Sequence, residues 1–257
     1  MNAARAGGDG TASGGSMSGR MTGRRHARRL RGIVFDKDGT LYDFNATWGA
    51  WTLGMLHAEA GGDPVLVATM AELLGYDPDA RRFRKDSVVI AHTPGEIADV
   101  IGPLLPGSPS KAEIVGRMNA RSAVAPQVEA APLGPFLDGL IGRGLTLGVA
   151  TNDGEEPARA HLEASGVADR FAFLAGADSG HGYKPGPGQL RAFCEETGLH
   201  PSEVAMVGDS TYDLLAGRSA GMVTVGVLTG LAEEADLAPL AEVVLGSIAD
   251  LPGWLDL

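Results

Sequence analysis

The sequence has little of three things: cysteine, long apolar runs and positive charge. Cys194 is the single cysteine, so no disulfide can form within the chain, which fits a reducing cytoplasm. No stretch approaches the roughly 18 apolar residues that a membrane-spanning helix needs. The formal net charge is −11, which argues against nucleic acid as a partner. We therefore expect a cytoplasmic protein without a membrane or nucleic-acid partner.

The first 29 residues differ in composition from the rest of the chain. Residues 1–19 are rich in Gly, Ala and Ser, and apart from Met they lack the bulky apolar side chains that offset ordering entropy. Residues 20–31 read RMTGRRHARRLR and are strongly basic. An export signal would continue with about 7–15 apolar residues, whereas only residues 33–35 follow before two aspartates. We expect residues 1–29 to form a disordered basic tail.

Short apolar runs bounded by Gly and Asp mark the expected strands. Such runs are typical of strands that are buried on both faces. They lie at residues 30–35, 145–150, 203–208, 223–228 and 242–245. Helical spacings of apolar residues lie between them, for example at 155–165 and 187–197. This alternation predicts an α/β fold with a mostly parallel sheet.

Residues 44–131 interrupt the alternation and contain no convincing strand. Gly- and Pro-containing breaks separate the helices expected in this segment. They lie at residues 45–60, 64–75, 94–103 and 110–122. We interpret residues 44–131 as an α-helical domain that is inserted after the first strand, and residues 30–43 with 132–257 as the core that receives it.

Polar residues follow the expected strands at the points where the strands end. Because parallel strands point their carboxyl ends to one edge of the sheet, and ligands bind there, these side chains should converge. Two acidic residues follow the first strand, a threonine follows the second, and two acidic residues follow the third, with a lysine in the loop between the second and third. They are Asp36, Asp38, Thr151, Lys184, Asp209 and Asp213.

The chemistry of this set indicates phosphoryl transfer. Clustered carboxylates repel one another unless a cation is present, and hard oxygen ligands suit Mg²⁺. A metal-bound carboxylate stays ionised and can attack phosphorus, while a second carboxyl two residues away can act as acid and base. Thr151 and Lys184 could hold and neutralise the phosphoryl oxygens, on which such transfers depend.

Four segments resemble the motifs of the haloacid dehalogenase superfamily, in their usual order. They are DKDGTLYD at 36–43, Thr-Asn at 151–152, Lys-Pro at 184–185 and GDSTYD at 208–213. The resemblance covers about residues 30–250. It implies a Rossmann-like catalytic core at 30–43 and 132–257 with a helical cap at 44–131, as in phosphoglycolate-phosphatase-like hydrolases.

The resemblance also implies a role for each residue. Asp36 would be the nucleophile and Asp38 the general acid and base. Mg²⁺ would bind Asp36, Asp209 and the main-chain carbonyl of Asp38, with Asp213 as a ligand or an outer carboxylate. Thr151 and Lys184 would contribute to catalysis by holding the phosphoryl group and stabilising its charge. Together with Asn152 they form the expected substrate-binding set.

Two residues depart from the family's pattern. Lys37 stands between the catalytic aspartates, where relatives often carry a hydrophobic residue; P-type ATPases share this lysine but have threonine in place of Asp38 and span membranes. True dehalogenases also lack the second aspartate. Asp153 follows the Thr-Asn motif and adds negative charge, and we expect it to be a solvated loop carboxylate rather than an inward one.

We therefore expect a magnesium-dependent phosphatase, monomeric or homodimeric, that hydrolyses a small phosphomonoester such as phosphoglycolate. A phosphomutase of the same superfamily is the alternative enzyme, because the cap decides whether water or a second hydroxyl attacks the intermediate. A non-catalytic binding protein on this scaffold would not need the full set of motif residues. Residues 81–85 hold a basic cluster that could meet a substrate carboxylate, although a solvated surface is the more ordinary role.

The aromatic and histidine residues of the cap suggest packing rather than chemistry. We expect Trp48 and Trp51 to belong to the cap core. His57, His92 and His181 are expected to be satisfied surface or packing residues.

Overall fold

The sheet of the core has six parallel strands. The computed structural model describes residues 30–84, 87–90 and 92–256; the expected tail at 1–29 lies outside them. The strand order is β5-β4-β1-β6-β7-β8. The strands are β1 (Gly32–Phe35), β4 (Thr146–Ala150), β5 (Phe173–Ala175), β6 (Val204–Gly208), β7 (Val223–Val227) and β8 (Val243–Leu245). The predicted α/β fold with a parallel sheet is confirmed, and the short β5 is an addition to the expected strands.

Alternate residues of the central strand face the two apolar layers of the core. Ile33 and Phe35 belong to the layer that includes residues of α6 (Leu133–Ile141), α7 (Glu155–Ala164) and α11 (Leu251–Leu255). Val34 belongs to the layer on the opposite face, with residues of α8 (Gly188–Thr197) and α9 (Thr211–Ala220). β1 is fully buried because both faces are covered, which explains its continuous apolar sequence.

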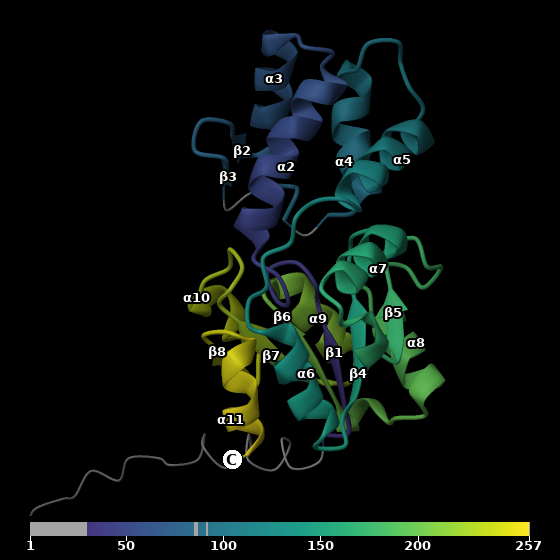
Figure 1. The fold of residues 1–257 in the computed structure, drawn as a ribbon, viewed down its shortest axis with the longest axis vertical. Helices are drawn as coiled ribbons and strands as arrows, with labels where there is room; N and C mark the ends of the chain where they lie inside the picture. Colours follow the sequence, from purple (N-terminus) through teal and green to yellow (C-terminus); the bar gives the residue numbers. More distant parts are fainter. Residues whose placement is uncertain (1–29, 85–86, 91, 257) are drawn as a thin grey trace, which may run out of the picture.

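The cap is a separate helical layer above the strand ends (Figure 1). Its helices are α2 (Phe44–Glu59), α3 (Pro64–Leu74), α4 (Pro94–Ile101) and α5 (Lys111–Ser122). They pack around their own apolar cluster, which contains Met55, Met70, Ile101 and Ile114. Asp63, Thr93 and Ser110 accept hydrogen bonds from the first turns of α3, α4 and α5, so side chains define where these helices begin.

A small hairpin in the cap corrects the expectation that residues 44–131 contain no strand. β2 (Tyr76–Asp77) pairs with β3 (Arg82–Phe83) in an antiparallel register. Each strand has two residues, which is too short for a period-two pattern to appear in the sequence. The hairpin buries Tyr76 and Phe83 against the cap cluster.

The two chain segments that join cap and core run side by side. Tyr42 and Glu129 form an antiparallel bridge. Asp43 N donates to Val128 O at 2.8 Å, and Ala130 N donates to Leu41 O at 2.9 Å. The cap therefore enters and leaves the core through a short two-stranded link.

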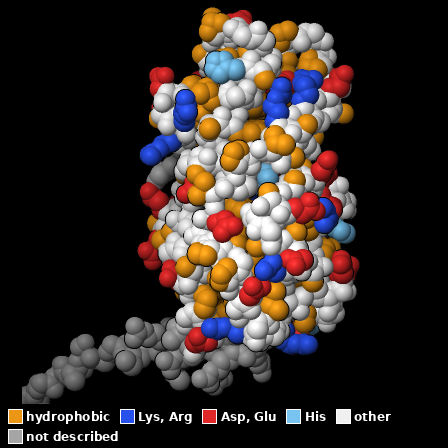
Figure 2. Space-filling view, in the orientation of Figure 1, with side chains coloured by type: hydrophobic (Ala, Val, Ile, Leu, Met, Phe, Trp, Pro, Cys, Tyr) orange, Lys and Arg blue, Asp and Glu red, His pale blue; other side chains and the backbone are white. Residues whose placement is uncertain are grey.

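The surface in view mixes charges of both signs. Figure 2 shows acidic and basic side chains interspersed over cap and core, with hydrophobic side chains scattered between them. In the described ranges, no helix combines the length and the apolar character that crossing a membrane requires.

Candidate active site

Three buried carboxylates meet at the carboxyl ends of β1 and β6. Asp36 follows β1 and Asp209 follows β6, and these strands are neighbours in the sheet. Asp213 lies in the first turn of α9, where it forms a reciprocal cap with Ser210. One ligand atom from each carboxylate lies within 4.8 Å of the others. Asp36 precedes Asp209 by 173 residues and Asp213 by 177 residues in the sequence. The fold brings these three acidic side chains together.

Lys184 joins this cluster from the loop before α8. Its Nζ donates to Asp36 Oδ1 and to Asp213 Oδ1, each at 2.7 Å. Burial opposes its charge, yet Asp213 and Asp36 together raise the pKa of Lys184 above its ordinary value. The lysine is therefore held fully charged between two acids.

The cluster carries more negative charge than one lysine can balance. Burial raises the pKa of Asp36 to about 7, against the opposing effect of Lys184 and with further repulsion from Asp213. Burial and the repulsion of Asp36 and Asp213 also raise the pKa of Asp209 well above its ordinary value. A divalent cation held by oxygen ligands would relieve this repulsion. The donor set therefore fits a hard metal ion.

Two glycines make room for these carboxylates. Gly39 has φ 83°, a left-handed conformation, and a Cβ there would collide with the carboxylate of Asp209. A Cβ on Gly208 would collide with the side chain of Asp213. The glycines of the DKDGTLYD and GDSTYD segments thus permit the close approach of the loop, the strand end and the acids.

Thr151 and Asn152 stand after β4, on the other side of β1. Thr151 is 1% exposed, and its Oγ1 accepts a hydrogen bond from Asp153 N at 3.1 Å. Asn152 Nδ2 donates to Lys184 O, and Asn152 Oδ1 accepts from Lys184 N, both at 2.9 Å. Asn152 therefore fixes the main chain of Lys184. Its expected contact with substrate stays a prediction.

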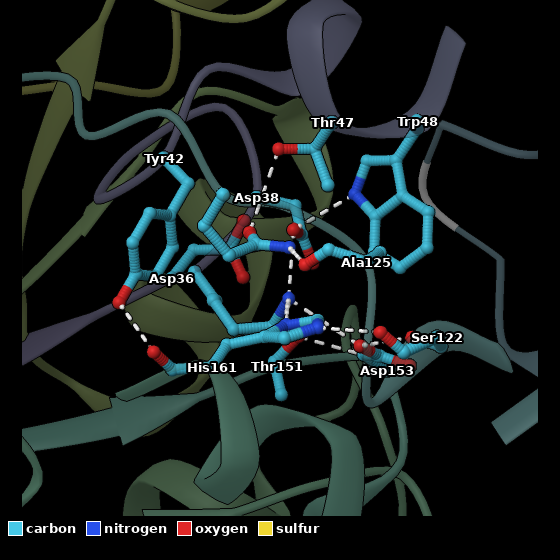
Figure 3. A network of polar contacts seen from close by, with 12 residues as sticks. Asp36, Asp38, Tyr42, Thr47, Trp48, Ser122, Ala125, Thr151, Asp153 and His161 are labelled. Carbon is cyan, nitrogen blue, oxygen red and sulfur yellow. Dashed lines mark hydrogen bonds and ion pairs between the residues drawn. The ribbon is translucent and has the colours of Figure 1, made fainter. Parts of the chain in front are cut away.

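Asp38 receives two donors on the same oxygen. Lys37 Nζ donates to Asp38 Oδ1 at 2.7 Å, and Trp48 Nε1 of the cap helix α2 donates to it at 2.8 Å. Figure 3 shows Trp48 pointing from the cap toward Asp38. The Lys37 Nζ also lies 5.3 Å from the centre of the Trp48 ring, within cation–π range. The expectation that Trp48 is only cap core is incomplete, because its indole N–H reaches into the core.

The side chain of Asp153 is buried, which corrects the expectation of a solvated loop carboxylate. Its side chain is 8% exposed, and its Oδ2 lies 3.3 Å from Lys37 Nζ. Burial raises the pKa of Asp153, although Lys37 opposes this shift. The unusual lysine in the first motif and the unusual aspartate after the second motif are therefore ion-pair partners. Sequence reasoning treated the two departures separately, because the motifs are far apart along the chain.

His161 completes the network, and sequence reasoning missed it. The ring is 1% exposed; Nδ1 accepts from Lys37 Nζ at 3.2 Å, and Nε2 donates to Ser122 O of the cap at 2.7 Å. Burial, followed by the charge of Lys37, lowers the pKa of His161 to about 4. A neutral imidazole with its proton on Nε2 satisfies both contacts. No motif pointed to His161, which is one polar residue on the amphipathic helix α7.

Most of the residues described above line one cleft between cap and core, although Lys37 and His161 are not part of its lining. The cleft has a volume of about 670 Å³, counting the part that is open to solvent. Six of the seven expected site residues line it, and Asp209 lies beside it within the acidic cluster. Arg81, Arg82 and Arg84 of the basic cluster do not line it; Arg84 pairs with Glu72 on the cap surface. Lys85 lies outside the described residues.

Comparison with known proteins identifies the family. The family model described as haloacid dehalogenase-like hydrolase matches residues 30–221. The chain therefore belongs to the haloacid dehalogenase-like hydrolases. A phosphoglycolate phosphatase of Rhodospirillum rubrum is 38% identical over 120 residues, which cover 47% of this chain and half of the relative. One of Yersinia pseudotuberculosis is 29% identical over 225 residues, or 87% of this chain and 92% of the relative.

Solved structures share the fold at lower identity. CbbY from Rhodobacter sphaeroides, solved in complex with phosphate, has a TM-score of 0.66 and 21% identity, covering 89% of this chain and all of that chain. β-Phosphoglucomutase from Clostridium difficile has a TM-score of 0.63 and 16% identity, covering 88% of this chain and 97% of that chain. These likenesses show the cap-and-core architecture.

Proposed function

We propose that the chain is a magnesium-dependent phosphatase that hydrolyses a small phosphomonoester through a phospho-aspartate on Asp36. The observation that carries this proposal is the position of Asp36, which lies against Lys184 and within the acidic cluster while Asp38 stands two residues away. Phosphoglycolate is the reference substrate, since phosphoglycolate phosphatases are among the relatives in sequence.

Each core residue has a separate role in the first step, in which phospho-Asp36 forms. An Asp36 oxygen attacks phosphorus and forms a new P–O bond, while the bond to the leaving alkoxide breaks. Lys184 and Thr151 hold the phosphoryl oxygens and offset their charge. Asp38 gives a proton to the alkoxide, so the alcohol leaves neutral. Both donors to Asp38 contact Oδ1, so the transferred proton belongs on Oδ2.

The second step regenerates the enzyme. Asp38, now ionised, takes a proton from water as the water oxygen attacks the phosphorus of phospho-Asp36. The bond between phosphorus and the Asp36 oxygen breaks, and inorganic phosphate leaves. Mg²⁺ would be held by Asp36, Asp209, the Asp38 main-chain carbonyl and Asp213, and when bound it supplies positive charge to the phosphoryl oxygens.

The test is phosphate release from p-nitrophenyl phosphate and from phosphoglycolate. We expect turnover with Mg²⁺, loss of turnover with a chelator, and a drop of at least about 10³-fold in Asp36→Asn with unchanged circular dichroism. Asp169→Asn is the matched control, because that carboxylate is exposed and remote from the cleft. Wild-type activity in Asp36→Asn would refute the mechanism.

The second candidate is a phosphomutase, favoured by the structural likeness to β-phosphoglucomutase. Both activities use the same core residues, and they differ in whether water or a sugar hydroxyl accepts the phosphoryl group. Incubation with hexose phosphates and separate measurement of free phosphate and isomerised sugar distinguishes them. Isomerisation that outpaces phosphate release would favour the mutase.

A further inference from the structure

The two walls of the cleft differ in charge. The core wall carries Asp36, Asp38, Asp153 and Asp213 with Lys184. The cap wall is built mainly from aromatic and aliphatic side chains and carries neither a carboxylate nor a lysine or arginine among its described residues. Because the phosphoryl group belongs at the core wall, the cap wall faces the leaving group.

Aromatic rings border the space on the cap side. Trp48 and Trp51 pack edge to face, with ring centroids 5.0 Å apart. His92 of the cap and Tyr212 of the core approach each other across the cleft, with centroids 6.2 Å apart. Rings in this arrangement suit a flat substrate group, which can stack on the face of one ring or contact the edge of another.

Three cleft-lining residues of the cap have buried polar atoms without a hydrogen-bond partner. These atoms are Trp51 Nε1, His92 Nδ1 and Asn119 Oδ1. Buried polar groups are nearly always paired, since leaving one unpaired costs about 1–3 kcal/mol. Trp51 can only donate and the Asn119 oxygen can only accept. A ligand that satisfies both must carry an acceptor and a donor.

We propose that the leaving group of the preferred substrate is a flat, uncharged aromatic or heteroaromatic group with a hydrogen-bond acceptor and a donor. This inference rests on the proposed phosphatase function. A carboxylate such as that of phosphoglycolate would lose its water beside an apolar wall, across from four aspartates. None of the described arginines of the 81–85 cluster lines the cleft to compensate.

His92 offers the one competing interpretation. A protonated imidazole at this position would attract a carboxylate, whereas a neutral imidazole would pair with an uncharged donor or acceptor. The two interpretations demand opposite preferences for a pair of esters that differ only in charge.

The experiment compares 4-carbamoylphenyl phosphate with its near-isostere 4-carboxyphenyl phosphate, with phenyl phosphate and phosphoglycolate as references. We expect kcat/KM for the carbamoyl ester to exceed that for the carboxy ester by at least about tenfold, and to exceed that for phosphoglycolate. Equal or reversed preference overturns the inference and leaves the phosphatase function standing. Failure to hydrolyse any of the four esters refutes the proposed function, and the inference falls with it.

Substitutions in the cap wall test whether its residues cause the preference for the carbamoyl ester. In Trp51→Phe and in Asn119→Ala we expect the ratio of kcat/KM for the carbamoyl ester over phenyl phosphate to fall about tenfold, because the first removes the indole donor and the second removes the side-chain amide with its acceptor oxygen. Arg82→Gln, at an exposed position of the hairpin, should leave the ratio unchanged. An unchanged ratio in both cap-wall variants, or a ratio that changes only in Arg82→Gln, overturns the inference.

Discussion

Lys37 and Asp153 form a buried ion pair, with 3.3 Å between Nζ and Oδ2, and both side chains are less than a tenth exposed. Removing one partner of a buried pair leaves an uncompensated charge. We expect Lys37→Met to lower the free energy of unfolding by about 3–5 kcal/mol, measured by urea denaturation.

The matched double variant separates charge from packing. Lys37→Met with Asp153→Asn removes both charges of this pair but leaves Asp38 without its Lys37 donor, so we expect the double variant to recover part of the loss seen in Lys37→Met. If the loss in the double variant equals the sum of the losses in Lys37→Met alone and Asp153→Asn alone, the pair is not coupled.

Trp48 links the cap to Asp38 through one hydrogen bond. Trp48→Phe keeps an aromatic ring but removes the N–H donor, so Asp38 loses a contact that fixes its orientation. We expect kcat to fall about tenfold at saturating substrate. Trp254→Phe, a similar change in the remote helix α11, is the control. A kcat in Trp48→Phe equal to that of the control variant would argue against the positioning role.

His161 should make stability depend on pH. Its folded pKa of about 4 lies below the ordinary value of 6.5, so between these values the unfolded chain binds the proton more readily. Stability contributed by the neutral ring is therefore complete above pH 6.5 and is lost as pH falls toward 4. The loss is up to about 3 kcal/mol.

The comparison between variants isolates this histidine from the titrating carboxylates. We expect unfolding free energies at pH 5 and pH 7.5 to differ less in His161→Gln than in the wild type, while the exposed His57→Gln behaves as the wild type. The same pH dependence in all three proteins would contradict the assignment.

The acidic cluster predicts opposite effects of Asp209→Asn with and without metal. If Mg²⁺ is held by this cluster in the folded state alone, then at about 100 times its Kd it should stabilise the wild type by about 2.7 kcal/mol and raise Tm by several degrees. In a chelator, Asp209→Asn should be as stable as the wild type or more so, since one repelling carboxylate is gone. A full Mg²⁺-dependent rise of Tm in Asp209→Asn would exclude Asp209 as a ligand.

The parallel sheet was the part of the fold that the sequence predicted best. Continuous apolar strands such as 203–208 can only be buried on both faces, and this alone implies covering helices. The hairpin at Tyr76 and Phe83 was not predictable, because two-residue strands carry no periodic signal and are fixed by packing in the cap.

The residues of the site also differ in how far the sequence predicts their positions. Asp36, Thr151 and Asp209 follow strands, so the sheet brings them to one edge whatever the loops do; their roles stay predictions. Asp153 was placed wrongly, because its burial depends on Lys37, a partner 116 positions earlier in the chain. His161 was missed because nothing local distinguishes a helix residue that contacts Lys37 from one that contacts water.

The paired link at Tyr42 and Glu129 makes the cap an exchangeable part. The inserted segment leaves the core and returns to it at neighbouring points, so its two ends lie as close together as the ends of a hairpin loop. The cap also holds its own apolar cluster, so its sequence can diverge without disturbing the sheet. Grafting a different cap between these two points should change which esters are accepted, provided that the graft keeps the indole donor to Asp38 and the carbonyl acceptor for His161. In this architecture, the rest of the cap can change while the side chains of the core stay in place.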